Sequence, residues 1–262
     1  MKNTLETFVV LLCGIFTSSI VNAADKLEAK QFYEIRQYSI VDDTTEAALD
    51  SYLKDAFLPA MERLGIGPIG VLATAPQDEN PQRRVVVIVP LDRPGLILNV
   101  KQKLKKDAAY LTAAADFMAR ENANPGYKRI VTELAVAMKC MPKAIVPEGT
   151  LENEDRVYEL RTYESVNERV GDLKVEMFNN GEVPIFLATG ITPIFIAQTV
   201  VGPQTPSLTY LSLFPNNDAR LKAWGDFLAH PDWKVLSGKK EYQGTVSRID
   251  KYVLVAKPYS QM

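Results

Sequence analysis

The chain has 262 residues, of which 47% are hydrophobic and 24% charged; this is an ordinary globular composition, long enough for two modest domains. Its formal net charge of −2 argues against a nucleic-acid partner, because phosphate binding needs a basic face. The one basic run, at residues 101–106, falls in a helical stretch and is interpreted as a solvated helix face.

The N-terminal segment predicts a signal peptide. A lysine at position 2 precedes an apolar run over residues 8–16, and the sequence at 21–23 fits the small-residue rule of signal peptidase. We therefore expect residues 1–23 to be removed by cleavage near Ala23, and the protein to be secreted or periplasmic. The apolar run is too short for a permanent transmembrane helix, which needs about 20 residues, so no stable membrane anchor is expected.

The remaining chain contains an internal duplication. FYEIRQY at residues 32–38 returns as VYELRTY at 157–163, and LGIGPIG at 64–70 returns as TGITPIF at 189–195. Both motifs repeat at the same offset of 125 residues, which indicates two copies of one structural unit.

Each copy predicts the order strand, helix, strand, strand, helix, strand. In the first copy we expect strands at 32–39, 68–75, 83–91 and 127–140, and helices at 45–64, 96–106 and 108–121. In the second we expect strands at 157–164, 193–201, 207–214 and 245–257, and helices at 168–188 (interrupted near 180–181), 217–229 and 231–237.

This order is that of the ferredoxin-like βαββαβ unit, so the predicted fold class is α+β. Repeat 1 spans residues 30–141 and repeat 2 residues 156–262, joined by a linker at 142–155 that is rich in proline and acids. In such a unit both helices cover one face of the sheet, and the other face must be buried. Two units in one chain can bury these faces against each other as a closed barrel or sandwich.

The repeated strand offers a candidate site. Its polar face carries the same three residue types in both copies: Glu34, Arg36 and Tyr38, and Glu159, Arg161 and Tyr163. We expect the opposite, apolar face to lie under the helices and these six side chains to point between the two sheets. They would form a pocket for a small anionic or carbonyl-bearing ligand, or serve only as ion pairs and packed tyrosines that fix how the halves dock.

The sequence predicts no cofactor and no metal site. It has one histidine, His230, and beyond the signal peptide one cysteine, Cys140, which is too few for a ligand cluster or a disulfide. It contains no nucleophile elbow, zinc-protease, phosphate-loop or dinucleotide motif. Trp224 and Phe227, three apart on an expected helix, are interpreted as core residues.

The second copy resembles the NIPSNAP family along its whole length. The matching positions are Tyr158, Glu159, Leu160, Arg161 and Tyr163; Gly190; Gly202, Ser207, Leu208 and Tyr210; and Trp224, Phe227, Pro231, Asp232 and Trp233. The first copy keeps the strand motif but lacks the tryptophan segment. The resemblance implies a dimeric α+β barrel, here a pseudo-dimer within one chain, and the PYSQ ending is similar to that of exported bacterial members with two copies.

The resemblance implies no settled activity. Together with the absent motifs it favours a small-ligand-binding or interaction module that uses the polar space between the two sheets. The alternative is a cofactor-independent oxygenase or isomerase of the dimeric α+β barrel type, in which Arg161 and Tyr163 polarise a carbonyl or enolate and Glu159 is the general base. Exposed sheet edges could also pair two molecules into a homo-oligomer.

Overall fold

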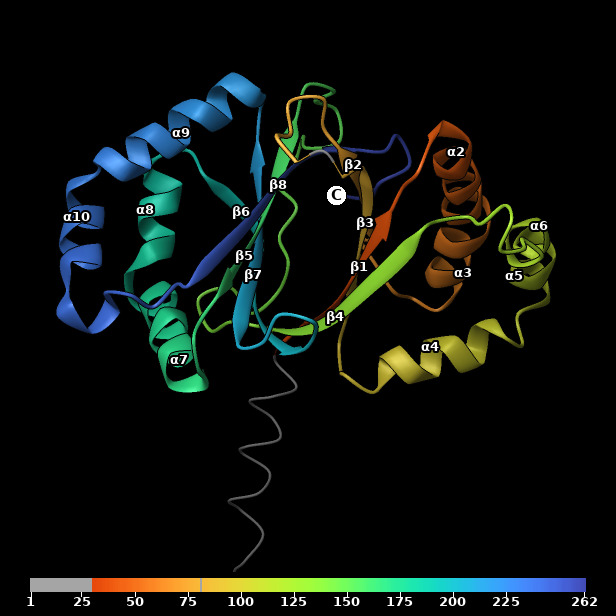
Figure 1. Ribbon diagram of the computed structural model, residues 1–262, viewed down its shortest axis with the longest axis horizontal. Helices are drawn as coiled ribbons and strands as arrows, with labels where there is room; N and C mark the ends of the chain where they lie inside the picture. Colours follow the sequence, from red (N-terminus) through yellow and green to blue (C-terminus); the bar gives the residue numbers. More distant parts are fainter. Residues whose placement is uncertain (1–29, 81) are drawn as a thin grey trace, which may run out of the picture.

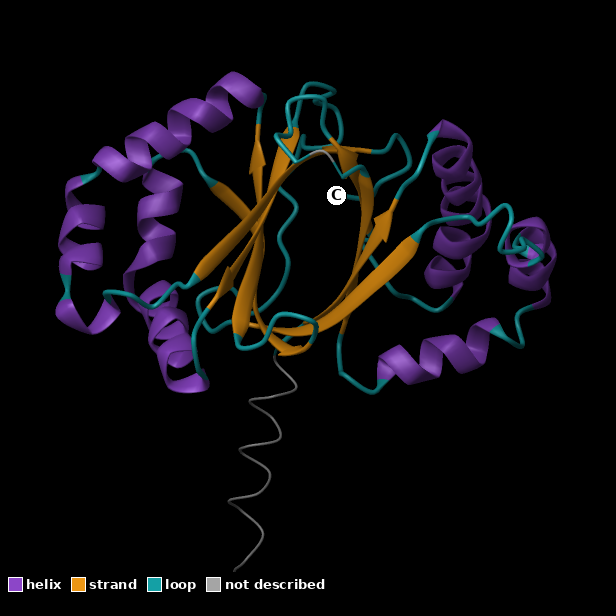
Figure 2. Cartoon of the chain, in the orientation of Figure 1, coloured by secondary structure: helices purple, strands orange, loops and turns teal. Residues whose placement is uncertain are grey.

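The computed structural model describes residues 30–80 and 82–262, so the signal peptide expected at residues 1–23 lies outside the described part. Eight strands close into a barrel at the centre of the molecule, and the helices of the two repeats cover opposite sides of it (Figure 1). Figure 2 shows the same division, with every helix on the outer side of a strand layer.

Both repeats have the predicted order of elements. Repeat 1 contains β1 (Phe32–Ser39), α2 (Asp43–Ser51), η1 (Tyr52–Phe57), α3 (Leu58–Arg63), β2 (Gly70–Thr74), β3 (Arg84–Leu91), α4 (Leu96–Leu104), α5 (Ala108–Ala113), α6 (Ala115–Met118) and β4 (Arg129–Ala137). Repeat 2 contains β5 (Val157–Glu164), α7 (Glu168–Met177), η2 (Phe178–Glu182), α8 (Val183–Ala188), β6 (Thr192–Val201), β7 (Ser207–Phe214), α9 (Asn217–Ala229), α10 (Pro231–Gly238), η3 (Lys240–Tyr242) and β8 (Arg248–Ala256).

The strand order around the barrel is β1-β3-β2-β8-β5-β7-β6-β4, and all neighbours are antiparallel. Each repeat therefore contributes four contiguous strands in the ferredoxin-like arrangement, and the two sheets join at the β2–β8 and β4–β6 seams. This confirms the α+β class and the pseudo-dimeric barrel within one chain. Every strand has a hydrogen-bonded neighbour on both sides, so the open sheet edge expected as a route to homo-oligomers is absent from the described strands.

The apolar side chains form three clusters. One lies between the strands and helices of repeat 1, one between those of repeat 2, and the third fills the barrel interior. In the interior cluster, Tyr33 stacks on Phe195 from the other repeat with ring centroids 4.6 Å apart, and both side chains are fully buried. The barrel is thus a packed core that unites the two repeats.

The first long helix of each repeat differs from expectation by containing a π-helical turn, η1 or η2. In repeat 2 this turn occupies the Asn180-Gly181 region, so the helix continues where an interruption was predicted. Two residues of the turn make polar contacts: Asn179 accepts a hydrogen bond from the Cys140 backbone N–H, and buried Glu182 pairs with Lys174 at 2.8 Å. The predicted helix ends are confirmed by Gly65 and Gly190, with φ of 67° and 83°.

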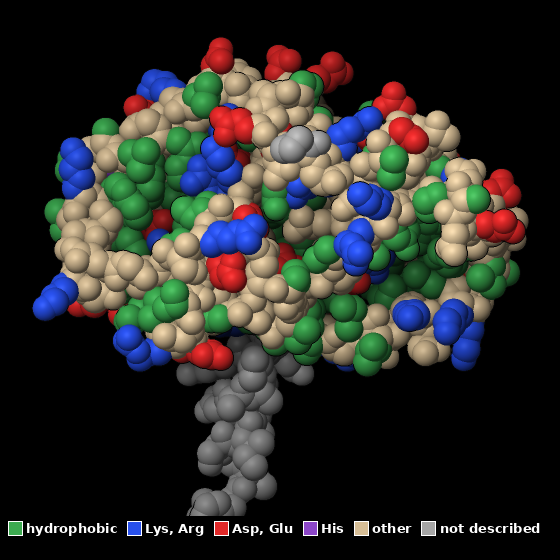
Figure 3. Space-filling view, viewed as in Figure 1, with side chains coloured by type: hydrophobic (Ala, Val, Ile, Leu, Met, Phe, Trp, Pro, Cys, Tyr) green, Lys and Arg blue, Asp and Glu red, His purple; other side chains and the backbone are tan. Residues whose placement is uncertain are grey.

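The visible face in Figure 3 carries acidic and basic side chains side by side rather than a field of one sign. Among the described residues, the structure contains no helix of the length and apolarity needed to span a membrane.

Candidate functional site

The six side chains that were expected between the sheets lie instead on the outer face of the barrel, under the helices. Tyr33 and Tyr158 belong to the barrel interior, whereas Tyr38 and Tyr163, on the other strand face, pack with the helices of their own repeat. The predicted orientation of the repeated strand is therefore wrong. The apolar set is needed to fill the closed barrel, and the charged set finds partners among the helices. The Glu/Arg/Tyr side chains of repeat 1 and those of repeat 2 are therefore not brought together.

In repeat 1 the charged pair is self-contained. Arg36 donates from Nε and Nη2 to the two carboxylate oxygens of Glu34, each at 2.8 Å, and its guanidinium lies 4.8 Å from the centre of the Phe57 ring. Tyr38 is buried beside them, and this burial raises its pKa. A bidentate pair of this kind satisfies both charges without an external ligand.

In repeat 2 one carboxylate serves two arginines. Glu159 is fully buried and accepts hydrogen bonds from Arg161 on its own strand and from Arg220 on α9. The Arg161 guanidinium also stacks 3.5 Å from the centre of the Trp224 ring. Trp224 thus packs as predicted for a core residue and also covers an arginine. Glu159 has neither exposed surface nor a carboxylate oxygen without a partner, so it lacks the substrate access that a general base needs.

The tyrosine of this set is also committed to packing. Tyr163 accepts a 2.7 Å hydrogen bond from Tyr210, and its ring meets the Tyr210 ring edge-on at 5.4 Å. Burial raises the pKa of both hydroxyls, so both stay protonated at neutral pH. The repeat-2 set is therefore a closed polar cluster between β5 and the helices.

A polar space between the two sheets does exist, and Tyr38 is the one member of the six predicted side chains in its lining. A cavity of about 250 Å³ opens at the barrel end where β1 finishes, and we call it the mouth pocket. The polar side chains of its lining come from both repeats: Gln37, Tyr38, Ser39, Gln82, Arg84, Glu133, Gln204 and Tyr252.

Glu133 is the buried carboxyl group of the mouth pocket. It points inward from β4, is 4% exposed, and its Oε1 has no hydrogen-bond partner in the described part of the chain. Burial raises the pKa of Glu133 to about 7, and the Thr209 hydroxyl offsets this only in part. A buried carboxyl oxygen without a partner is costly, so this atom marks a place where a ligand group would be stabilising.

Arg84 supplies the cation of the mouth pocket. Its guanidinium lies 3.5 Å from the centre of the Tyr252 ring, and Nε and Nη2 both donate to the Gln82 carbonyl at 3.3 Å. Nη1 makes a longer contact of 3.5 Å with Gln37. No carboxylate pairs with this guanidinium within the described residues, in contrast to Arg36 and Arg161.

Sequence reasoning missed both charged residues of the mouth pocket. Their signal is present in retrospect: Arg84 alternates with Val86 and Ile88 along β3, and Glu133 alternates with Ala135 along β4. A charge in an otherwise apolar inward row marks the polar end of a barrel. The repeated strand motif is the stronger sequence signal, because its charged residues occur in both copies.

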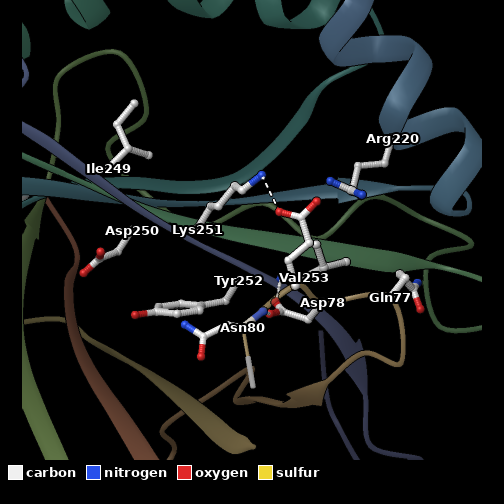
Figure 4. Close-up of a pocket in the computed structure, with 10 residues that line it drawn as sticks. Gln77, Asp78, Asn80, Arg220, Ile249, Asp250, Lys251, Tyr252 and Val253 are labelled. Carbon is white, nitrogen blue, oxygen red and sulfur yellow. Dashed lines mark hydrogen bonds and ion pairs between the residues drawn. The ribbon is translucent and has the colours of Figure 1, made fainter. Parts of the chain in front are cut away.

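A second cavity, of about 360 Å³, lies on the outer side of β8 at the β2–β8 seam. Figure 4 shows Arg220, Lys251 and Asp250 around it, with Asp78 and Asn80 from the β2–β3 loop. The carboxylates here already have partners: Asp78 accepts from the Asn80 and Val253 backbone N–H groups, and Asp250 accepts from Gln204 and Arg248. This seam cavity is therefore less suited to a ligand than the mouth pocket.

Among the described residues, no group of three or more His, Cys, Asp or Glu side chains is close enough to hold a metal ion. His230 instead caps α10, where its Nδ1 accepts a hydrogen bond from the Asp232 backbone N–H at 3.2 Å.

Fold and site together define a single-chain dimeric α+β barrel with a polar pocket at one end. The NIPSNAP family model matches residues 158–261, which covers almost all of repeat 2. The second repeat is thus a NIPSNAP domain, as its sequence motifs predicted. No protein with a curated function matches the sequence.

Two solved structures that each match 87% of this chain share its fold. A proposed monooxygenase from Fusobacterium nucleatum is 8% identical with a TM-score of 0.55, covering 87% of this chain and 92% of its own. A second, from Lactobacillus acidophilus, is 12% identical with a TM-score of 0.50, covering 87% and 94%. A NIPSNAP-like domain protein from Burkholderia xenovorans is 19% identical with a TM-score of 0.37, covering 41% and 90%. At these identities the likeness establishes the fold alone.

Proposed function

We propose that this protein is a binding module for a small anionic or carbonyl-bearing molecule, which occupies the mouth pocket between the two sheets. The observation that carries the proposal is the partnerless Oε1 of buried Glu133, in a cavity that also contains an arginine without a carboxylate partner. A ligand that contacts both groups would satisfy two polar side chains that the protein leaves incomplete.

The oxygenase or isomerase alternative has less support. Its general base would be Glu159, whose two oxygens are held by Arg161 and Arg220 in a fully buried cluster. The monooxygenase descriptions belong to proteins that share 8–12% of their residues with this chain, and at that level the shared barrel does not imply shared chemistry.

Ligand binding can be tested by thermal-shift screening of the purified protein against small carboxylic acids, phenols and haem. We expect acids to raise the melting temperature of the wild type and to lose this effect in Arg84→Gln. The matched control is Arg63→Gln, since Arg63 forms an ion pair with Asp107 on the helical surface of repeat 1. Equal shifts in all three proteins would remove Arg84 from the site, and no shift with any acid would overturn the proposal.

We also propose that the protein acts outside the cytoplasm, as a secreted or periplasmic module. The support is the N-terminal sequence, in which a lysine, a short apolar run and the small residues before position 24 match a cleavable signal peptide. Expression of the full chain in a bacterial host, followed by N-terminal sequencing of the exported fraction, tests this. Retention of uncleaved protein in the cytoplasm would contradict it.

A further inference from the structure

We infer that the mouth pocket selects a bifunctional ligand: a small carboxylic acid that also carries a hydroxyl or ammonium group, with its carboxylate on Arg84 and its donor on Glu133. This inference rests on the proposed ligand-binding function and names the ligand class for the same pocket. It follows from the two ends of the pocket and from what lies between them.

The Arg84 end is prepared for a carboxylate. A guanidinium has five N–H donors in a rigid fork, and the contacts with Gln82 and Gln37 use three of them. The other two N–H donors remain for a ligand. Stacking on Tyr252 already fixes the plane of the guanidinium. A carboxylate that accepts them needs little further ordering of the arginine, which favours binding.

The Glu133 end is prepared for a hydrogen-bond donor. Its Oε1 is buried without a partner, so an approaching hydroxyl or ammonium group would supply the missing hydrogen bond. The neighbouring inward side chains on β6 and β7 offer only hydroxyls, and these are already engaged: Thr209 with Thr162 at 2.9 Å, and Thr199 with Ser207 at 2.9 Å. On this wall, Glu133 Oε1 is a buried acceptor with no partner among the described residues.

The strand register separates the two ends. Arg84 lies opposite Ser39 and Glu133 lies opposite Ile35, on the two strands that flank β1. Their backbones are therefore about 13 Å apart along the strand direction and about 10 Å apart across it, before the side chains reach toward each other. Ile35 and Val131 line the space between, which suits a short hydrocarbon segment joining two polar groups.

Charge complementarity excludes simpler ligands. A plain alkanoate would pair with Arg84 but would leave Glu133 without a donor. A plain amine would be repelled by the positive charge of Arg84. A hydroxy acid or an amino acid satisfies both ends at once. Because a hydrogen bond to a charged group contributes about 1.5–3 kcal/mol, the bifunctional acid should bind at least about 10-fold more tightly than its matched alkanoate.

Calorimetry with matched acids tests this inference. Terminal hydroxy and amino alkanoates of increasing length are titrated against the alkanoates of the same length, using wild type and Glu133→Met. Methionine fills a similar volume and removes a buried carboxyl without a partner, so the variant should fold; thermal melting verifies this. We expect one chain length to show the largest preference in the wild type, and Glu133→Met to bind both members of each pair alike.

The outcomes separate the two proposals. If no acid of either kind binds, the proposed function itself fails. If alkanoates bind as tightly as their bifunctional partners in the wild type, the function stands and the inferred ligand class is wrong. A preference that persists unchanged in Glu133→Met would also overturn the inference, because the donor would then be recognised elsewhere.

Discussion

Glu133 makes the stability of the protein depend on pH in a direction that the structure determines. Burial raises its pKa from 4.5 to about 7. A carboxyl with a higher pKa in the folded state binds its proton more tightly there. The contribution of Glu133 to the free energy of unfolding is therefore fully present below pH 4.5 and is lost as the pH rises through about 7. Above that, the ionised, 4% exposed side chain costs about 3 kcal/mol, at 1.36 kcal/mol per pKa unit.

Most of this cost, about 2–3 kcal/mol, falls between pH 5 and pH 8. Urea unfolding at these two pH values should therefore show the wild type losing that much more free energy of unfolding than Glu133→Gln, which has no proton to exchange. Other groups, such as Glu182, whose pKa burial also raises, are present in both proteins and cancel in the comparison. Glu62→Gln, an exposed substitution on α3, serves as the control and should follow the wild type.

The reasoning would be refuted if Glu133→Gln retained the full pH dependence of the wild type. Such a result would mean that the carboxyl is ionised at neutral pH without penalty and hence has a partner in solution. The same experiment repeated with a bound ligand would then show whether that partner can be displaced.

Two further changes test the packing on either face of the barrel. Glu159→Gln leaves two arginines without their shared carboxylate, and should lower the free energy of unfolding by about 3–5 kcal/mol. Glu34→Gln frees only one arginine and should cost less, so equal losses in urea titrations would contradict this assignment. Gly202→Ala would put a Cβ 2.9 Å from the Glu133 Cβ, and should cost about 1–3 kcal/mol and weaken acid binding. Gly225→Ala meets nothing within 4 Å on α9 and should raise the melting temperature, whereas a rise in Gly202→Ala would count against the tight contact.

Most of the fold follows from the duplication. Two motifs at one offset identify the repeats, and the helix-ending glycines Gly65 and Gly190 occupy equivalent positive-φ positions. Together with the βαββαβ order, these signals predict either a closed barrel or a sandwich of the two sheets. The π-helical turns were not predicted, because they depend on contacts with distant segments, such as that between Asn179 and Cys140.

The site was harder to predict because it depends on which face of a strand points inward. In the repeated strand both faces mix polar and aromatic residues, so alternation alone does not decide between them. In repeat 2 the charged face also meets Arg220, which pairs with Glu159 across 61 residues of sequence and so is not visible in the strand motif. The two charged residues of the mouth, Arg84 and Glu133, occur once each and outside every repeated motif.

That the two charged residues of the mouth lie outside the repeated motif follows from what a fused pair can do and a symmetric dimer cannot. By register, Glu133 lies opposite Ile35 as Tyr252 lies opposite Leu160, so the carboxyl of repeat 1 corresponds to the phenol of repeat 2. Likewise Arg84 corresponds to Ser207, opposite Ser39 and Glu164. A homodimer would have to place two arginines and two glutamates in one mouth, since its halves are identical. Fusion allows a single arginine to stack on the tyrosine that replaces the second glutamate, and this leaves one cation and one acid for a ligand with two different ends.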